Sequence, residues 1–220
     1  MSTFQRDSRP RKLCFVTIGA TAAFDALIKA ALSPPFLEAL KISGYTDLRL
    51  QHGKDGRLIL EEFRESYGAK SEEEHGIVVT GFDFNKQGLG SEMRAAKGED
   101  NRTEGVVISH AGVLSMQSSI PDMKLTSSGS GSILDALRIA VPLIVVPNPA
   151  LLDNHQEELA EELAKQGYVI HGNLHDLPAA IRQSESLRKS RNAWPPRNER
   201  EDPSGKGLIG VMDDELGFVD

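Results

Sequence analysis

The sequence predicts an α/β fold, a Rossmann-like, doubly wound parallel sheet with helices on both faces. Three observations support this prediction. Short apolar runs rich in β-branched residues alternate with helical patterns along most of the chain, as they do in βαβ units. Several of these runs are apolar at every position, which is typical of central parallel strands buried on both faces. Small or polar residues follow the ends of the runs, where sheets of this kind bind their ligands.

The composition is that of an ordinary globular protein and narrows the possible partners. The 220 residues are enough for one α/β domain with tails, with 39% apolar and 26% charged residues. A formal net charge of −7 argues against nucleic acid as a partner, because phosphate binding needs a basic surface. The single cysteine, Cys14, excludes an intrachain disulfide and a cysteine-rich zinc site, and its apolar surroundings predict burial.

No targeting or membrane-spanning segment is predicted. Residues 1–12 are polar and basic with no apolar segment after them. The most apolar window, 133–147, is shorter than the roughly 20 residues that a membrane span needs. We therefore expect a cytosolic protein, or one held at a membrane by another chain.

The first half of the domain begins with an apolar strand and the tight turn Gly19-Ala20-Thr21. Apolar spacing and the breakers Pro and Gly predict, in order, a strand over 13–18, a helix over 24–31, a helix over 36–42 and a strand over 47–53. Residues 54–76 have weaker signals, and a short strand near 58–60 followed by a charged loop is expected there. Residues 76–82 are predicted to form a third buried strand, and a short helix is expected around 93–96.

The second half continues the alternation. The pattern predicts a strand over 106–109, a helix over 132–140, a strand over 143–147, an amphipathic helix over 154–166, a short strand over 168–170 and a terminal helix over 174–187. The folded domain is thus expected at 12–187, with residues 113–129 as an inserted loop. Residues 1–11 are expected to be disordered, and residues 188–220 are expected to form a flexible linker and an acidic tail.

A diphosphate-binding cradle is predicted between the strand at 106–109 and the following helix. Ser109-His110-Ala111-Gly112 ends the strand, and Ser130-Gly131-Ser132 opens the helix. A helix N-terminus offers unpaired N–H groups and a positive dipole end, and Gly and Ser allow close approach to the backbone. Further strand ends should meet this cradle at one edge of the sheet, namely those at Gly19-Ala20-Thr21, Gly81-Phe82 and 147–155.

Several stretches resemble one family, the catalytic subunit of the eukaryotic UDP-N-acetylglucosamine transferase of dolichol-linked oligosaccharide assembly. The similar segments are residues 15–28, residues 108–112 together with 130–137, and residues 153–160, which include Asp153-Asn154-His155-Gln156. The ending 213–218 is similar to fungal members. The resemblance covers most of residues 12–187, and a more remote one exists to the donor-binding half of the bacterial lipid-linked N-acetylglucosaminyltransferase of peptidoglycan synthesis.

The resemblance implies a fold and an activity. The chain would be the donor-binding, C-terminal half of a GT-B glycosyltransferase, and would transfer GlcNAc with inversion from UDP-GlcNAc to GlcNAc-diphosphodolichol. The acceptor half would be a separate membrane-anchored subunit that recruits this chain, as a heterodimer, to the cytosolic face of the endoplasmic reticulum. No cofactor is expected. Metal-independent transfer is also expected, because no Asp-x-Asp clamp presents itself and Asp213-Asp214 lies in the tail.

The resemblance also assigns residues to the donor, each beside a plainer alternative. The predicted diphosphate ligands are the residues at the helix start, Ser130, Gly131 and Ser132, although a serine there is also an ordinary N-cap. Asp135 would hold the ribose hydroxyls, or it only complements the helix dipole. Gly19 and Thr21 would let the first loop approach the donor phosphates or the acceptor diphosphate, although family members usually carry a hydroxyl where Ala20 stands.

Other candidates concern the transferred sugar, the uracil and the catalytic step. His110 is a candidate general base for the acceptor hydroxyl, a neutral hydrogen-bond donor to the diphosphate, or a structural turn histidine. Its neighbours complete the predicted strand-end site: Ser109, Ala111 and Gly112. Sugar hydroxyls and the N-acetyl group are assigned to the next helix start, where capping is the alternative: Asn154, His155 and Gln156. Phe82 would lie near the uracil, or in ordinary core.

One feature departs from the family. Its members run Ser-His-Ala-Gly directly into Ser-Gly-Ser, whereas residues 113–129 intervene here. The segment is either a loop, which costs little chain entropy, or a retained intron. The alternative function is therefore a catalytically impaired nucleotide-sugar-binding or scaffolding chain. A nucleotide-binding oxidoreductase ranks last, because no Gly-x-Gly-x-x-Gly follows the first strand.

Overall fold

A six-stranded parallel sheet forms the centre of the molecule, in a computed structural model that describes residues 10–19, 23–100, 102–110, 132–150 and 155–190. The strand order is β3-β2-β1-β4-β5-β6, and every neighbouring pair is parallel. The strands are β1 (Leu13–Thr17), β2 (Asp47–Gln51), β3 (Val78–Phe82), β4 (Val106–His110), β5 (Leu143–Val146) and β6 (Ile170–His171). The chain builds outwards from β1 to β3 and then crosses back to β4, so the predicted doubly wound sheet is confirmed.

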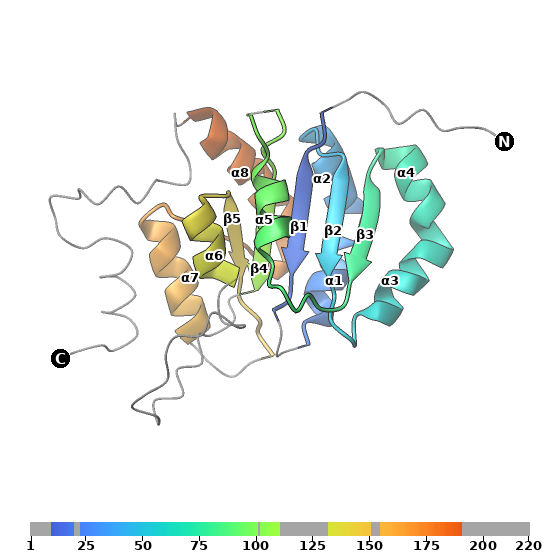
Figure 1. Cartoon of the computed structure of the whole chain (residues 1–220), viewed down its shortest axis with the longest axis horizontal. Coiled ribbons are helices and arrows are strands. Elements are labelled where there is room, and N and C mark those ends of the chain that lie inside the picture. The colour runs from blue at the N-terminus through green and yellow to red at the C-terminus, as the bar shows by residue number, and fades with distance from the viewer. Residues whose placement is uncertain (1–9, 20–22, 101, 111–131, 151–154, 191–220) are drawn as a thin grey trace, which may run out of the picture.

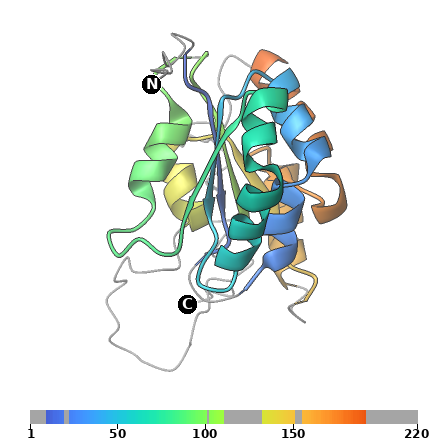
Figure 2. The same ribbon diagram turned by 90° about the vertical axis from the view of Figure 1, so that its right-hand side faces the viewer.

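Helices cover both faces of this sheet (Figures 1 and 2). One face is packed by α1 (Asp25–Ala31), α2 (Pro34–Ile42), α3 (Arg57–Phe63) and α8 (Leu177–Ser190). The other face is packed by α5 (Gly90–Lys97), α6 (Ser132–Ile139) and α7 (His155–Lys165). A π-helical turn (Arg64–Gly68) and α4 (Ala69–His75) connect α3 to β3, and a 3-10 turn (Leu174–Asp176) leads into α8.

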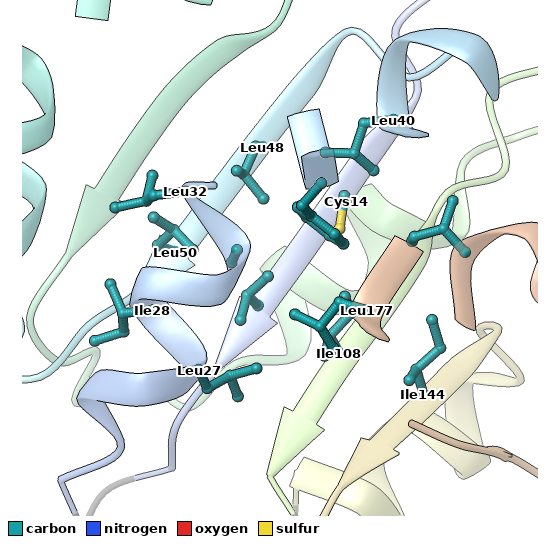
Figure 3. Close-up of a cluster of buried hydrophobic side chains, with 14 of the residues drawn as sticks. Cys14, Leu27, Ile28, Leu32, Leu40, Leu48, Leu50, Ile108, Ile144 and Leu177 are labelled. Carbon is teal, nitrogen blue, oxygen red and sulfur yellow. The ribbon is translucent and has the colours of Figure 1, made fainter. Parts of the chain in front are cut away.

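The central strand β1 is buried on both faces, as its apolar sequence predicts. Cys14 and Val16 lie in the core on one side of the sheet, and Phe15 lies in the core on the other. Figure 3 shows Cys14 among apolar side chains of the core that also contains Val16, and these side chains include Leu48 and Ile108. Cys14 has no exposed surface, so its predicted burial is confirmed, and this burial raises the pKa of the thiol.

The largest difference from the expected elements lies in residues 54–76. The expected short strand and charged loop are wrong, because this segment forms α3, the π-helical turn and α4. Leu60 is buried, and Phe63 and Tyr67 pack against the same core at spacings of three and four residues, which is a helical pattern. Leu58, in contrast, is 63% exposed. Three consecutive apolar residues therefore resembled a strand although only one of them is fully buried.

β3 is an edge strand, so the prediction of a third buried strand is also wrong. It pairs with β2 alone, and Val78 is 40% exposed. The helix that follows β3 does not cover it, because α5 packs on β1 and β4 at the centre of the sheet (Figure 1). Smaller differences lie near the C-terminus, where β6 comprises Ile170–His171 and α8 continues through residues 188–190.

Several predicted segments lie outside the described residues. They are most of the N-terminal segment, the insertion at 113–129 and the tail beyond residue 190. Within the part of the chain that the structure describes, no helix combines the length and apolarity required to cross a bilayer.

Candidate functional site

The candidate site lies at the carboxyl ends of β1 and β4. These two strands are neighbours in the sheet, yet the chain leaves β1 towards one edge and leaves β4 towards the other. This is the switch point at which doubly wound sheets bind ligands, because the connecting segments diverge there and leave a crevice. Gly19 follows β1 and His110 ends β4, so both predicted residues lie at the switch point.

His110 lies with its ring close to Gly19, which follows β1, and to Phe24, which precedes α1. Its side chain is only 5% exposed, and its ring centroid lies 6.2 Å from that of Phe24. Its Nδ1 is buried and has no hydrogen-bond partner outside its own residue among the described residues. Burial lowers the pKa of His110, so the imidazole is neutral near pH 7. A neutral ring offers one N–H donor and one acceptor lone pair, which suits either the predicted base or the predicted diphosphate donor.

Gly19 makes the closest approach to this ring. Its φ of +76° favours glycine, and a Cβ placed there would lie 3.1 Å from Cε1 of His110. The N–H of Gly19 donates a hydrogen bond to Oγ1 of Thr17 at 3.1 Å. This hydrogen bond already uses the amide of Gly19. Gly19 would therefore favour phosphate binding by its lack of a side chain and its positive φ, rather than by donating its N–H.

The structure separates the other described candidates from this pair. Ser109 precedes His110 and so faces the opposite side of the sheet, where it is fully buried and its Oγ donates to the His110 carbonyl at 3.0 Å. Phe82 ends β3, two strands from β1, or about 10 Å away across the sheet. It stacks on Phe15 with ring centroids 6.3 Å apart, and the Arg49 guanidinium lies 5.1 Å from its ring centroid.

Asp135 lies in the first turn of α6, as predicted, and remains accessible. Its carboxylate is 3.7 Å from Nη1 of Arg138, and the two side chains are 42% and 66% exposed. An exposed pair of this kind is weak, so the carboxylate is free to accept hydrogen bonds from ligand hydroxyls.

The remaining predicted residues are described only in part. Six of them lie outside the described residues: Thr21, Ala111, Gly112, Ser130, Gly131 and Asn154. The backbone places three more at helix starts, Ser132 in α6 and His155 and Gln156 in α7. Each of these helices connects two parallel strands and begins at the carboxyl edge, so the predicted helix N-termini face the same edge as Gly19 and His110.

Sequence reasoning missed three polar residues at this edge. Asn148, which is 5% exposed, follows β5; its Nδ2 donates to the Ala23 carbonyl at 3.5 Å and its Oδ1 accepts from the Ala150 N–H at 3.1 Å. It thereby links the loop after β5 to the loop after β1, and its place between two prolines just after a strand was the available signal. Thr17 and Gln51 end β1 and β2 in the structure, but they fell within the expected strands 13–18 and 47–53 and gave no such signal.

A family model matches most of the chain. The glycosyltransferase family 28 C-terminal domain matches residues 13–193. The chain belongs to this family. It is therefore a glycosyltransferase domain of the Rossmann-like type found in the C-terminal half of GT-B enzymes, as the sequence resemblance implied.

Related proteins point in the same direction. The chain is 34% identical to the UDP-N-acetylglucosamine transferase subunit ALG13 of Yarrowia lipolytica, over 72% of this chain and 63% of that protein. It is 34% identical to the subunit of the same name from Saccharomyces cerevisiae, over 72% of this chain and 76% of that protein. A solution NMR structure of ALG13 is similar with a TM-score of 0.56 and 26% identity, and the match covers 94% of each chain.

Proposed function

We propose that this chain is the donor-binding, catalytic subunit of a two-chain N-acetylglucosaminyltransferase. It would add the second GlcNAc from UDP-GlcNAc to GlcNAc-diphosphodolichol, with inversion at the anomeric carbon. The observation that supports this most directly is the meeting of Gly19 and a buried neutral His110 at the switch point of a family 28 domain. The starts of α6 and α7 face the same edge, where N–H groups favour an anionic ligand.

The chemistry follows from where charge develops. The acceptor hydroxyl oxygen forms the new bond to the anomeric carbon while the bond to the phosphate oxygen of UDP breaks. Negative charge therefore grows on the leaving diphosphate, and fixed N–H groups at the start of α6 stabilise it without reorganising. Asp135, in the first turn of that helix, would accept hydrogen bonds from the ribose hydroxyls. His110 would take the proton of the acceptor hydroxyl or donate a hydrogen bond to the diphosphate.

The proposal includes a membrane-anchored partner. The relatives are named as transferase subunits, which implies a second subunit. A single Rossmann-like domain has one donor crevice, so a second chain would present the lipid-linked acceptor. That chain would recruit this one to the cytosolic face of the endoplasmic reticulum.

Reconstitution with the partner subunit tests the function. The assembled pair should bind UDP in calorimetry and transfer GlcNAc from UDP-GlcNAc to a GlcNAc-diphospholipid. An assembly that gives no heat with UDP or UDP-GlcNAc would contradict the proposal. Transfer by this chain alone, without a partner, would contradict the two-chain part only.

Residues 113–129 favour a second candidate function, that of an inactive nucleotide-sugar-binding or scaffolding chain. They separate the strand end at His110 from the helix start at Ser132, two parts that a cradle must bring together. Deleting residues 113–129 discriminates between the two functions. Transfer by both forms supports the enzyme, whereas transfer by the deleted form alone assigns the intact chain to the second class. Sequencing the transcript decides whether the segment is a retained intron.

A further inference from the structure

Three buried polar side chains lie side by side across the sheet, at or next to the carboxyl ends of β2, β1 and β4. Gln51, Thr17 and Ser109 are register neighbours on β2, β1 and β4. Thr17 and Ser109 have no exposed surface, and Gln51 is 3% exposed. Burying polar groups costs free energy unless they are hydrogen-bonded, and aliphatic side chains fill such positions without that cost. The polar choice at these positions therefore calls for a role beyond packing.

The hydrogen bonds of Thr17 run in one direction. Its Oγ1 donates to Oε1 of Gln51 and accepts from the N–H of Gly19 at 3.1 Å. A threonine hydroxyl carries a single proton. Once Gln51 accepts that proton, a lone pair of Thr17 is left for the amide of Gly19. Gln51 thus sets the orientation of a hydroxyl that in turn holds the backbone of the first turn.

Gly19 is fixed from two sides as a result. Thr17 holds its amide, and Cε1 of the His110 ring lies 3.1 Å from the point where a Cβ would stand. Its φ of +76° requires such support, because few contacts otherwise keep a glycine in one conformation. The backbone conformation of Gly19 is therefore set by Gln51, Thr17 and His110 together.

We propose that Thr17 and Gln51 are positioning residues for the nucleotide-sugar donor. Gln51 orients the Thr17 hydroxyl and Thr17 holds the Gly19 amide, so the backbone of Gly19 is held in one conformation at the edge where the donor diphosphate would bind. This assignment rests on the proposed function, because it concerns the same crevice. It adds two residues that touch neither donor nor acceptor and act through the backbone of Gly19.

Isosteric variants test the assignment in the assembled two-chain enzyme. Thr17→Val removes the hydroxyl, Thr17→Ser keeps it, and Gln51→Met removes the acceptor at similar volume. Thr46→Val is the matched control, because the Thr46 hydroxyl accepts from the Lys12 N–H at 3.0 Å and donates to Asp47 at 2.7 Å at the opposite end of the sheet. The measurements are the UDP affinity, the KM for UDP-GlcNAc, kcat and the KM for the acceptor lipid.

We expect Thr17→Val and Gln51→Met each to raise the KM for UDP-GlcNAc and the Kd for UDP about two- to tenfold, the range of one lost hydrogen bond. kcat and the acceptor KM should stay unchanged, and the double variant should be no worse than either single one. Thr17→Ser, which keeps the hydroxyl, should bind the donor as the wild type does, and Thr46→Val should also leave donor binding unchanged.

Other outcomes overturn the assignment. Unchanged donor binding in Thr17→Val, or equal losses in Thr17→Val and Thr46→Val, would show that Thr17 has only a structural role. If Thr17→Val does not fold, Gln51→Met takes its place, and donor binding that is unchanged in Gln51→Met would overturn the assignment. Thr17→Ser then serves as the variant that should bind the donor normally. A wild-type assembly that binds no UDP contradicts the proposed function itself, whereas normal wild-type binding with unaffected variants contradicts this assignment alone.

Discussion

The two ends of the sheet differ in how their buried titratable groups are paired, although Nε of Arg188 at the amino end also makes no hydrogen bond to any described residue and is only ion-paired, 3.2 Å from Oε2 of Glu104. At the amino end, Lys12, Glu185 and Arg188 form a paired cluster that joins β1 to α8. Nζ of Lys12 lies 2.9 Å from Oε2 of Glu185, and Nη1 of Arg188 lies 2.9 Å from Oε1. At the carboxyl end, His110 keeps a buried nitrogen with no partner beyond its own residue among the described residues. Paired charges hold the fold together at the amino end, whereas, in the part of the chain that the structure describes, the carboxyl end keeps a buried ring nitrogen without such a partner beside Gly19.

Further contacts strengthen the amino-end cluster. The Tyr45 hydroxyl donates to Oε1 of Glu185 at 2.9 Å, and Arg188 donates to the carbonyls of Glu104 and Gly105, each at 2.8 Å. Burial lowers the pKa of Lys12 and raises that of Glu104, which shows that both charges lie in a poorly solvated region. The comparison predicts that changes at the amino end affect stability and that changes at the carboxyl end affect donor binding.

The largest effect is expected from Glu185→Ala at the amino end. This change removes the carboxylate that Lys12 and Arg188 both contact. Arg188 keeps its ion pair with Glu104, but Lys12 loses its carboxylate partner, and an uncompensated buried charge destabilises a protein by about 3 kcal/mol or more. Urea unfolding measures the loss, and UDP affinity under native conditions should not change. A large loss of UDP affinity in the folded variant would break the proposed division between the two ends.

Gly19→Ala should produce the next largest effect, now on the donor. The φ of +76° costs an alanine about 1–2 kcal/mol, and its Cβ would meet the His110 ring at 3.1 Å. We expect UDP affinity to fall about tenfold, by calorimetry on the assembled enzyme. Gly44→Ala is the control, because Gly44 has the same φ of +76° and no atom within 4 Å of an added Cβ. Equal effects of both changes on UDP affinity would contradict a specific role for Gly19.

The pH dependence of stability offers a smaller test at His110. Burial lowers the folded-state pKa of His110, so the unfolded state binds more protons near and below the usual value of about 6.5. The stability contributed by the neutral ring is therefore fully present above that value and is lost as the pH falls towards the folded-state pKa. His110→Asn should reduce the change in the free energy of unfolding between about pH 5 and 7. The exposed His175, changed to Asn, is the control, and an equal flattening there would refute the interpretation.

The smallest effect on stability is expected from Asp135→Asn in α6. Its pair with Arg138 is exposed, so the free energy of unfolding should change by less than about 0.5 kcal/mol. If Asp135 holds the ribose hydroxyls, UDP affinity should nevertheless fall while the affinity for inorganic diphosphate stays the same. Competition binding with both ligands makes this measurement, and equal losses for UDP and diphosphate would argue against a contact with the ribose.

The accuracy of the sequence predictions depended on how local each signal was. The buried strands β1, β4 and β5 were correctly placed because apolar runs of their length leave few alternatives. Gly19 and His110 were found as candidates because each follows or ends a strand, which is visible along the chain. Residues 54–76 were assigned wrongly, because a single fully buried leucine determines the packed face of α3. The side chains that pack against Leu60 come from distant parts of the chain, so they meet it only in the folded core.

The sequence by itself determined the alternation of strands and helices, the family, and the strand ends at which a donor would bind. Apolar periodicity and turn residues act over a few positions, so they can be read along the chain. Only the tertiary structure decided that β3 is an edge strand, that Thr17 meets Gln51 across 34 residues of chain, and that Glu185 joins Lys12 across 173. These contacts depend on which strands become neighbours, and sheet order follows from the packing of the whole domain rather than from any local pattern.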